Sequence, residues 1–409
     1  MKTRILFVDD EPNVLSALRR MFHDMRGQWD MAFASDGPAG LAMIAERPFD
    51  VVVADMRMPG MDGAAFLREA QSMSPGAIRI VLSGHSDRDM ILQTVRPAHQ
   101  FLPKPCQPDE LKAVISRSLA LSEVFLDDRV KNVVARLDCM PTVPRLYSAL
   151  LETLGRENPS MREVAGLIAQ DVGMSAGILK LVNSAFFGLR VHVSSPAHAV
   201  NLLGLEVVKA LVLGVGLFDR FNKEAFRDFD LEKLWSHSLG AARLAREISV
   251  VENASPDVRE YCYIGGLLHD IGKLVMATNF PSAYRDVINA CQSGQGTVLE
   301  MERQLFGASH AEVGAYLLGL WGVDDQVVRA VYLHHEPSRD RHAGFSPLLA
   351  VHVANRLEHE LVVISQGYAI NPLDDIFLNA SGLAERLPVW REACQAVIAE
   401  GLPAEDEEA

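Results

Sequence analysis

The sequence predicts a multidomain protein in which an α/β domain with a doubly wound, five-stranded parallel sheet is followed by an all-α helical domain. Two observations predict this fold class. Over the first 120 or so residues, short β-rich runs alternate with amphipathic helical stretches, and such βα units build a parallel sheet with helices on both faces. From about residue 139 onward, long amphipathic helices dominate, and no run alternates polar and apolar residues as a half-buried strand would.

The elements of the α/β domain are assigned in chain order. We expect strands at residues 3–9, 29–34, 50–55, 78–83 and 99–103, and helices at 12–25, 37–46, 62–72, 87–95 and 108–120. In doubly wound sheets, ligands bind outside the carboxyl ends of the strands. We therefore expect the functional residues of this domain at the ends of its predicted strands.

The remaining elements are helical. Helices are expected at 145–154, 161–170, 174–185, 197–213, 231–249, 257–277, 281–292, 298–306, 310–321, 324–335 and 346–359. The chain is divided into a first domain at 1–120, a linker helix at 121–138, a helical domain at 139–336, a helical extension at 337–402 and an acidic tail at 403–409.

The linker helix has two interpretations. Its apolar residues Leu126, Val130, Val133 and Leu137 follow a 4-3-4 spacing. Such a stripe forms either a short coiled-coil seam between two chains or a face that packs on the chain's own second domain. A homodimer is therefore one of two expectations for this segment.

Composition excludes several classes of protein. The 409 residues carry a formal net charge of −14, which argues against a nucleic-acid-binding surface. The five cysteines have no C-x-x-C spacing, which fits a reducing compartment. The longest apolar stretch, 210–218, is far shorter than the roughly 20 residues that a membrane span needs. We expect a cytoplasmic protein without membrane insertion.

Residues suited to phosphoryl chemistry stand at the predicted strand ends. Asp9 and Asp10 end the first strand, Asp55 the third and Ser83 the fourth, while Lys104 follows the fifth. Carboxylates gathered at one edge suit Mg²⁺, which prefers oxygen ligands. Phosphoryl transfer depends mostly on positioning and electrostatic stabilisation, and a lysine would clamp a phosphoryl oxygen. Any one of these acidic residues alone would simply be a solubilising loop residue, but the set indicates a carboxylate that accepts a phosphoryl group.

These motifs closely resemble the receiver domain of two-component response regulators. The resemblance spans about residues 1–120 and rests on Val8-Asp9-Asp10-Glu11, Asp55-x-x-Met58-Pro59-Gly60-Met61-Asp62-Gly63, Ser83-Gly84 and Lys104-Pro105. It implies that Asp55 takes a phosphoryl group from a histidine kinase or phosphotransfer protein. It also implies that Asp10, Asp55 and the backbone carbonyl of Arg57 bind Mg²⁺ directly, with Asp9 acting through water.

Two further roles follow from the same resemblance. Ser83 would be the switch hydroxyl that contacts the phosphoryl group, and Phe101 would be the aromatic residue that turns inward when Ser83 engages it. The alternative for Phe101 is a plain core aromatic.

A second group of candidate residues lies in the all-α part. It comprises His237, His269, Asp270, His310, His334 and His335. Imidazole and carboxylate ligands together suit zinc, iron or manganese, and two such metals could activate water to attack a phosphate ester. Helical cores also hold hydrogen-bonded histidines without metal, and a histidine pair at a helix C-terminus suits the helix dipole. The sequence leaves both interpretations open.

The all-α part resembles the HD superfamily of metal-dependent phosphohydrolases, and more closely its HDOD branch, over about residues 139–336. The matching motifs are Met140-Pro141-x-x-Pro144, Leu179-x-x-x-Asn183-Ser184-Ala185-Phe186-Phe187-Gly188, Val193-Ser194-Ser195, Ala199-Val200-x-x-Leu203-Gly204 and Leu267-Leu268-His269-Asp270-Ile271-Gly272-Lys273. HDOD domains are better known as signalling and interaction modules than as enzymes.

The chain departs twice from the related HD-GYP cyclic-di-GMP phosphodiesterases, whose metal positions the six residues above match. No Gly-Tyr-Pro follows His334-His335-Glu336, and Asn355 stands where a late aspartate is expected. Because asparagine is neutral and a poorer bridging ligand, these departures weaken the prediction of a two-metal site.

The sequence features bear on three possible functions. The favoured one is a phosphorelay response regulator whose HDOD half is a non-enzymatic output that binds a downstream signalling protein or a nucleotide. The alternative is a phosphorylation-controlled, metal-dependent phosphohydrolase acting on a cyclic mono- or dinucleotide. A DNA-binding transcription factor is disfavoured because the chain is acidic and lacks a basic recognition helix.

Overall fold

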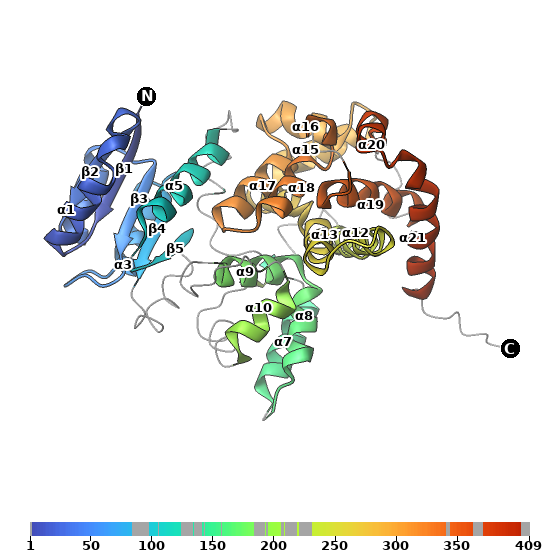
Figure 1. Ribbon diagram of the computed structural model, residues 1–409, viewed down its shortest axis with the longest axis horizontal. Helices are drawn as coiled ribbons and strands as arrows, with labels where there is room; N and C mark the ends of the chain where they lie inside the picture. The colour runs from blue at the N-terminus through green and yellow to red at the C-terminus, as the bar shows by residue number, and fades with distance from the viewer. Residues whose placement is uncertain are drawn as a thin grey trace. The chain divides into compact units, whose positions relative to one another are not determined.

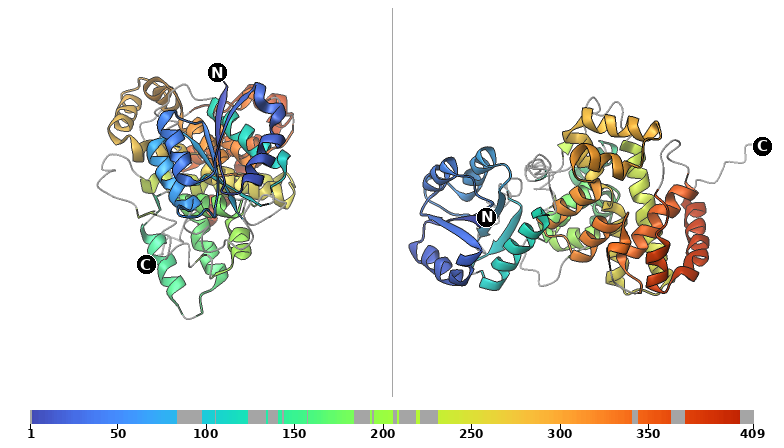
Figure 2. Two further views of the ribbon diagram at one scale, coloured as in Figure 1. Left: turned by 90° about the vertical axis from the view of Figure 1, so that its left-hand side faces the viewer. Right: turned by 90° about the horizontal axis from the view of Figure 1, so that it is seen from above.

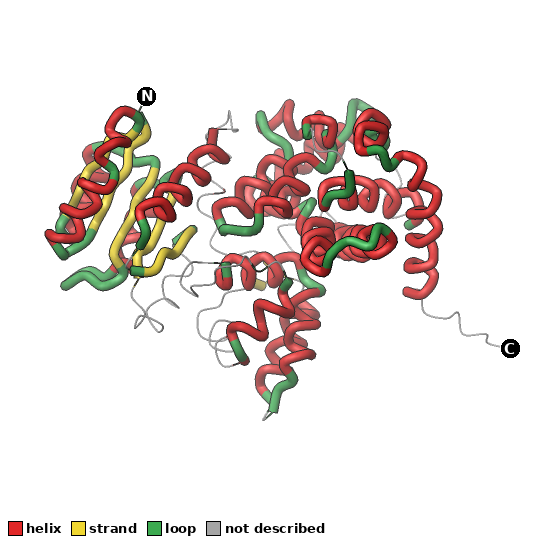
Figure 3. The backbone as a smooth tube through the Cα atoms, viewed as in Figure 1, coloured by secondary structure: helices red, strands yellow, loops and turns green. Residues whose placement is uncertain are grey.

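The computed structural model describes residues 2–83, 98–104, 106–123, 134, 141–142, 144–156, 158–183, 193, 195–205, 208, 219–220, 231–340, 344–362 and 371–401. The chain divides into two compact units. One comprises Met1–Phe221 with Tyr316–Val323, and the other comprises Asn222–Ala315 with Asp324–Ala409. Among the described residues, strands occur only in the first unit, and the second unit is built of helices (Figure 3).

The first unit begins with a parallel sheet of five strands in the order β2-β1-β3-β4-β5 (Figure 1). The strands are β1 (Thr3–Val8), β2 (Trp29–Ala34), β3 (Val51–Asp55), β4 (Ile78–Ser83) and β5 (Gln100–Pro103). Every residue of β3 and β4 is buried, as expected when helices cover both faces of a parallel sheet. The predicted doubly wound α/β fold is confirmed.

Helices lie on both faces of this sheet, with α1 and α5 on one side and α2 and α3 on the other (Figure 2). Their bounds are α1 (Pro12–Met21), α2 (Gly37–Glu46), α3 (Gly63–Met73) and α5 (Pro108–Glu123). The prediction of one helix over 12–25 is wrong at its end, because a 3-10 helix, η1 (His23–Gly27), follows α1. Phe22 at this junction is buried against the rings of Phe7 and Trp29, which turns the chain into the core. The helix predicted at 87–95 lies outside the described residues.

The first unit continues with helices and one minimal pair of strands. The elements are β6 (Pro141–Thr142), α7 (Pro144–Gly155), α8 (Met161–Ala169), α9 (Val172–Val182), α10 (Pro196–Leu203) and β7 (Asp219–Arg220). Strands β6 and β7 pair in parallel over two residues each, too short a run for any alternation to show in the sequence. The prediction of one helix over 197–213 is wrong, because Gly204 takes a φ of 78° and ends α10. Nearly all of the linker predicted at 121–138, with its apolar stripe, falls outside the described residues.

The second unit is a helical assembly. Its elements are α12 (Leu231–Val251), α13 (Pro256–Leu268), α14 (Ile271–Asn279), α15 (Pro281–Gln292), α16 (Val298–Phe306), α18 (Asp325–Leu333), η5 (Pro337–Arg339), α19 (Pro347–Leu361), α20 (Asp375–Ser381), η6 (Ala384–Arg386) and α21 (Leu387–Gly401). Helix α17 (His310–Leu320) begins in this unit, and its residues from Tyr316 onward belong to the first unit. Helix α19 lies at the centre of the core, where Leu349, Val353 and Leu357 are fully buried together with Trp390 of α21. No described helix is long and apolar enough to cross a membrane.

The prediction of one helix over 257–277 is wrong in a way that matters for the site. The chain breaks at His269 and Asp270, between the end of α13 at Leu268 and the start of α14 at Ile271. Asp270 leaves the helical region, with φ −102° and ψ 11°. The break directs both side chains into one buried cluster, which a continuous helix would not do for adjacent residues.

Glycine at position 272 lets α14 approach the start of α17 closely. A Cβ here would lie 1.9 Å from the carbonyl oxygen of His310 and 2.9 Å from the amide nitrogen of Gly314. No larger residue fits without moving one helix. The close approach brings Asp270, two residues earlier, beside His310.

We expect Gly272→Ala to lower the free energy of unfolding by about 1–3 kcal/mol, because the overpacked helices must separate. Gly166→Ala is the matched control: Gly166 is exposed on α8 and has no heavy atom within 4 Å of its built Cβ. Helix propensity should then raise the free energy of unfolding by up to about 1 kcal/mol. Denaturant unfolding followed by circular dichroism measures both, and a shift of the same sign in the two variants would contradict the packing argument.

Candidate functional site

The carboxyl edge of the five-stranded sheet gathers the acidic residues and the lysine that the sequence indicates. Ligand oxygens of Asp9, Asp10 and Asp55 all lie within 4.8 Å of one another. Lys104 Nζ lies 2.6 Å from Asp9 Oδ2 and 2.7 Å from Asp55 Oδ1. Asp9 and Asp55 are buried, and Asp10 is half-buried. Three carboxylates in this arrangement form a donor set that fits Mg²⁺.

Backbone contacts hold Asp55 in place. Asp55 pairs with Leu82 of β4, and the amide of Met56 donates a hydrogen bond to Leu82 O at 2.9 Å. A Cβ on Gly63 would lie 2.3 Å from Asp55 O, so glycine is needed where α3 begins. Asp62 caps that helix by accepting a hydrogen bond from Ala65 N at 2.7 Å. The Asp62-Gly63 pair thus brings the start of α3 against the backbone of Asp55.

Ser83 ends β4, one position after the residue that pairs with Asp55. Its side chain is buried, and Oγ has no hydrogen-bond partner among the described residues. An unpaired buried hydroxyl is costly, so this Oγ is suited to bind a further oxygen at the same edge. Lys104 N donates a hydrogen bond to Ser83 O at 2.7 Å, which joins the ends of β4 and β5.

The electrostatics of this edge depend on a single ammonium group. Burial, which disfavours charge, raises the pKa of Asp55, and the hydrogen bond from Lys104 offsets only part of that effect. Burial alone would lower the pKa of Lys104, but its hydrogen bonds to Asp55 and Asp9 outweigh burial and raise the pKa. Lys104 therefore stays charged and partly neutralises a buried anionic group.

Two residues that the sequence assigns to this site remain predictions. Arg57 lies two positions after Asp55 and is exposed, and its backbone carbonyl is the expected Mg²⁺ ligand. Phe101 lies in β5 and pairs with Val81, but its side chain is outside the described part of the chain.

The second unit brings all six predicted ligand residues to one place. His237 lies in α12, His269 and Asp270 join α13 to α14, His310 begins α17, and His334 and His335 follow α18. The start of α17 is fixed by a capping box, as Ser309 N and Oγ donate to Glu312 Oε2 at 2.6 and 2.9 Å.

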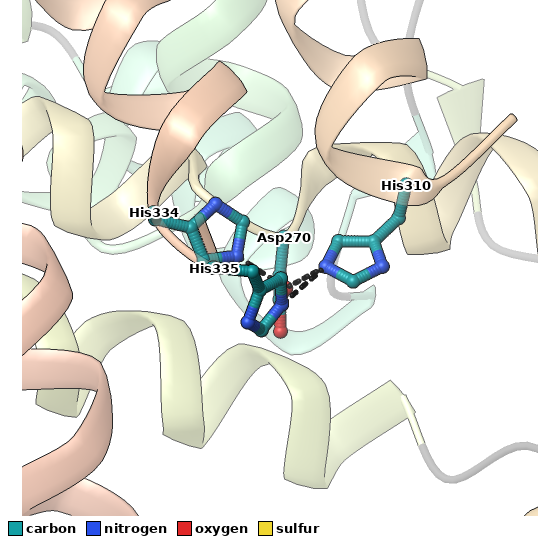
Figure 4. A group of neighbouring side chains, drawn as sticks. All are labelled: Asp270, His310, His334 and His335. Atoms are coloured by element: carbon teal, nitrogen blue, oxygen red, sulfur yellow. Dashed lines mark hydrogen bonds and ion pairs between the residues drawn. The ribbon is translucent and has the colours of Figure 1, made fainter. Parts of the chain in front are cut away.

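Asp270 is the centre of this group (Figure 4). Its Oδ1 lies 3.2 Å from His310 Nε2 and 3.9 Å from His334 Nε2. One ligand atom of each of these residues and of His335 lies within 4.8 Å of the others. This donor set of three imidazoles and one carboxylate fits zinc, iron or manganese.

The second oxygen of Asp270 faces another set of groups. Oδ2 lies 3.5 Å from His269 Nε2, 3.7 Å from His237 Nε2 and 2.7 Å from Lys273 Nζ. The side chain of Asp270 is 1% exposed, so both oxygens are enclosed by these partners. Asp270 thus belongs to two groups of possible metal ligands, one with His310, His334 and His335 and one with His237 and His269.

Hydrogen bonds fix the tautomers of two histidines. His269 Nδ1 lies 2.7 Å from Gly266 O, and His334 Nδ1 lies 2.7 Å from Val331 O. Because a carbonyl oxygen only accepts, each Nδ1 must carry the proton. In the neutral ring Nε2 then carries a lone pair and no proton, so it can act as a metal ligand. In both residues Nε2 faces Asp270.

The inward-facing nitrogens lie close together. His237 Nε2 lies 3.1 Å from His269 Nε2, and His310 Nε2 lies 3.0 Å from His335 Nε2. Burial lowers the pKa of His269 to about 4 and holds the pKa values of His334 and His335 well below their usual range. Because burial disfavours protonation of His269, its Nε2, which faces His237 Nε2, would suit a metal cation.

Neighbouring charges also shift the pKa values of His310 and Asp270. Burial alone would lower the pKa of His310, but the carboxylate of Glu302 outweighs it and raises the pKa. Burial alone would raise the pKa of Asp270, but the charges of His269 and Lys273 and the hydrogen bond from His310 hold it well below its usual range. Asp270 is therefore an anion and available as a ligand.

Three residues beside the cluster were not predicted from the sequence. Glu302 accepts a hydrogen bond from His310, Glu358 accepts one from His237, and the ring of His359 stacks on His237 at 4.3 Å. For Glu302, the sequence contains one signal of a buried role. This glutamate lies at helical spacing between the apolar residues Leu299 and Phe306 of α16, so it interrupts an apolar stripe with a charge.

Family models match both halves of the chain. A model described as the response regulator receiver domain matches residues 5–116, and one described as the HDOD domain matches residues 140–337. The chain is a two-component response regulator with an HDOD domain.

The receiver–HDOD chain is similar to several known proteins. An uncharacterized protein of Treponema pallidum (strain Nichols) is 26% identical over 232 residues, covering 54% of this chain and 43% of the relative. The hydrogenase transcriptional regulatory protein HoxA of Cupriavidus necator is 35% identical over 109 residues, covering 26% of this chain and 22% of HoxA. The chain thus spans less than half the length of these relatives. Among solved structures, the MmoQ response regulator of Methylococcus capsulatus is 26% identical, with a TM-score of 0.48, covering 62% of this chain and 98% of that one.

We expect the purified protein to take up zinc, iron or manganese, and Asp270→Ala to lose this metal, because the variant lacks the only carboxylate among the four clustered ligands. Elemental analysis by mass spectrometry after dialysis measures metal per chain. Asp286→Ala, in the exposed part of α15, should retain the wild-type content. Equal metal content in Asp270→Ala and wild type would contradict this assignment.

Proposed function

We propose that this response regulator is a phosphorelay switch in which Asp55 accepts a phosphoryl group from a histidine kinase or phosphotransfer protein. The observation that carries the proposal is the contact of one ammonium group, Lys104 Nζ, with both Asp55 and Asp9 beside Asp10. A carboxylate can attack phosphorus only where neighbouring charge is neutralised. Held by Asp10, Asp55 and the backbone carbonyl of Arg57, with Asp9 acting through water, Mg²⁺ would supply most of that neutralisation.

The residues of the chain have separate roles in the transfer. A carboxylate oxygen of Asp55 forms a bond to phosphorus as the bond between phosphorus and the donor's histidine nitrogen breaks. Lys104, already 2.7 Å from Asp55 Oδ1, pairs with one phosphoryl oxygen. Ser83 donates its otherwise unpaired hydroxyl to another. These two groups make the receiver sensitive to whether Asp55 carries the phosphoryl group.

The signal would leave the receiver through β5 and α5. Gln100 Nε2 donates a hydrogen bond to Leu320 O at 2.6 Å, and Arg117 Nη2 donates one to Val323 O at 2.6 Å. Both acceptors belong to the Tyr316–Val323 segment of the same compact unit. Leu320 ends α17, the helix that His310 begins. A shift of the receiver at this segment would therefore act on a helix that carries a residue of the histidine cluster.

The output is proposed to be a non-enzymatic HDOD module that binds a downstream signalling protein or a nucleotide. Two features of the sequence support this over catalysis: Pro337-Ser338-Arg339-Asp340 in place of Gly-Tyr-Pro, and the neutral Asn355 in place of the late aspartate. Phosphorylation would then set whether the partner is bound or released.

We expect a small-molecule phosphodonor with Mg²⁺ to add one phosphoryl group to the wild-type chain and none to Asp55→Asn, which lacks the nucleophile. Asp30→Asn removes an exposed carboxylate in β2 and should be phosphorylated as the wild type is. Intact-protein mass spectrometry measures the modification. Proteins captured from a lysate with and without phosphodonor should differ for wild type and Asp30→Asn, but not for Asp55→Asn. Identical captured proteins in all samples would contradict phosphorylation-controlled binding.

A second candidate function is a phosphorylation-controlled, metal-dependent phosphohydrolase of a cyclic mono- or dinucleotide. The observation that favours it is the convergence of imidazole nitrogens on both oxygens of Asp270, an arrangement that suits water activation by metal. Metal-loaded protein should then hydrolyse cyclic nucleotides, whereas Asp270→Ala should not. Product analysis by chromatography decides this, and no turnover with full metal occupancy would rule out this second function.

A further inference from the structure

Two buried glutamates hold two of the HDOD histidines in the same way. Glu302 Oε2 accepts a hydrogen bond from His310 Nδ1 at 2.6 Å, and Glu358 Oε2 accepts one from His237 Nδ1. The glutamate side chains are 0% and 1% exposed. In both histidines the opposite nitrogen, Nε2, faces Asp270, at 3.2 Å for His310 and 3.7 Å for His237.

We propose that Glu302 and Glu358 are positioning residues that hold His310 and His237 in the Nδ1–H tautomer, so that each Nε2 is free to bind a divalent transition metal beside Asp270. The inference rests on the metal cluster invoked for the second candidate function. A carboxylate that accepts the proton of a ligating imidazole both orients the ring and raises its basicity.

Four of the cluster's histidines donate from Nδ1, two to a backbone carbonyl and two to a glutamate. Their positions in the helices explain this difference. His269 and His334 follow the last turns of α13 and α18, where carbonyl oxygens have no partner within the helix. Each therefore donates to the carbonyl three residues earlier. His237 lies inside α12, where the carbonyls are used by the helix, and His310 begins α17, where only N–H groups are unpaired. A side-chain acceptor must replace the missing carbonyl.

The surroundings of both glutamates hold their side chains in place. Glu302 also accepts from Tyr284 Oη at 2.8 Å and from His310 N at 2.8 Å, so it lies at the positive end of α17. Glu358 lies against Gly240 of α12, where a Cβ would be 3.0 Å from Glu358 Cγ. A glycine one turn after His237 therefore leaves the room that the Glu358 side chain occupies.

Glu358 provides a carboxylate near Asn355, the neutral residue that stands where an aspartate is expected. Positions 355 and 358 share a face of α19, one turn apart. Asn355 is buried, and its Oδ1 has no hydrogen-bond partner among the described residues. The carboxylate of α19 therefore stands at Glu358, one turn after position 355. It contacts His237, whose opposite nitrogen faces Asp270.

The test uses the full chain with ¹⁵N-labelled histidine and compares wild type, Glu358→Leu, Glu358→Gln and Glu360→Gln. Glu360 is the matched control, because it lies on the same helix but pairs with Arg356 and Arg391. Long-range ¹H–¹⁵N spectra of the metal-free protein report the tautomer of each ring. Competition with a chelator measures affinity for Zn²⁺.

We expect the Nδ1–H form of His237 in wild type and Glu360→Gln, its loss in Glu358→Leu and its partial retention in Glu358→Gln, whose amide oxygen can still accept. Affinity for Zn²⁺ should fall by roughly 10- to 100-fold in Glu358→Leu and by less in Glu358→Gln. An unchanged tautomer in Glu358→Leu would overturn the inference even if wild type binds zinc. Loss of a whole zinc equivalent in both Glu358→Gln and His359→Ala would also overturn it, because Glu358 would then be a direct ligand. The expected tautomer shift in a chain that takes up no zinc would overturn the metal function alone.

Discussion

Each half of the chain is organised around one buried carboxylate that a single lysine neutralises. Lys104 Nζ lies 2.7 Å from Asp55, and Lys273 Nζ lies 2.7 Å from Asp270. Burying a charge without a partner costs several kcal/mol or more, so these pairs constrain what can surround them. In the receiver the pair ties the end of β5 to that of β3. In the HDOD half it ties the break between α13 and α14 to the first turn of α14.

The two carboxylates, Asp55 and Asp270, differ in the groups that surround them. Among the described residues, Asp55 lies beside two further carboxylates and one lysine, a set with an excess of negative charge that suits a hard cation. Asp270 is surrounded by imidazoles, and burial holds the pKa values of His269 and His334 low, so this site suits a softer transition metal. The carboxylate group around Asp55 and the histidine cluster around Asp270 lie in separate compact units.

Much of the receiver could be predicted from the sequence, because buried parallel strands and their ends can be recognised in it. A buried strand is a continuous apolar run, and a polar residue at its end must lie at the ligand-binding edge, which is how Asp9, Asp55 and Ser83 were found. Helical boundaries were harder. A single helix fits residues 257–277 by periodicity, whereas the structure breaks it at His269 and Asp270, because a buried carboxylate and the close approach at Gly272 outweigh helix propensity.

The sequence by itself determined the fold class of each half and the residue types that carry chemistry, because strand and helix periodicity and local motifs are short-range properties of the chain. The motifs already named five of the thirteen histidines as candidate ligands, but only the tertiary structure decided how these five converge on Asp270 and which ring nitrogen each presents. It also supplied Glu302 and Glu358, which lie 8 and 121 residues from the histidines that they contact. The contact between Glu358 and His237 joins residues far apart in the chain, so no local pattern records it.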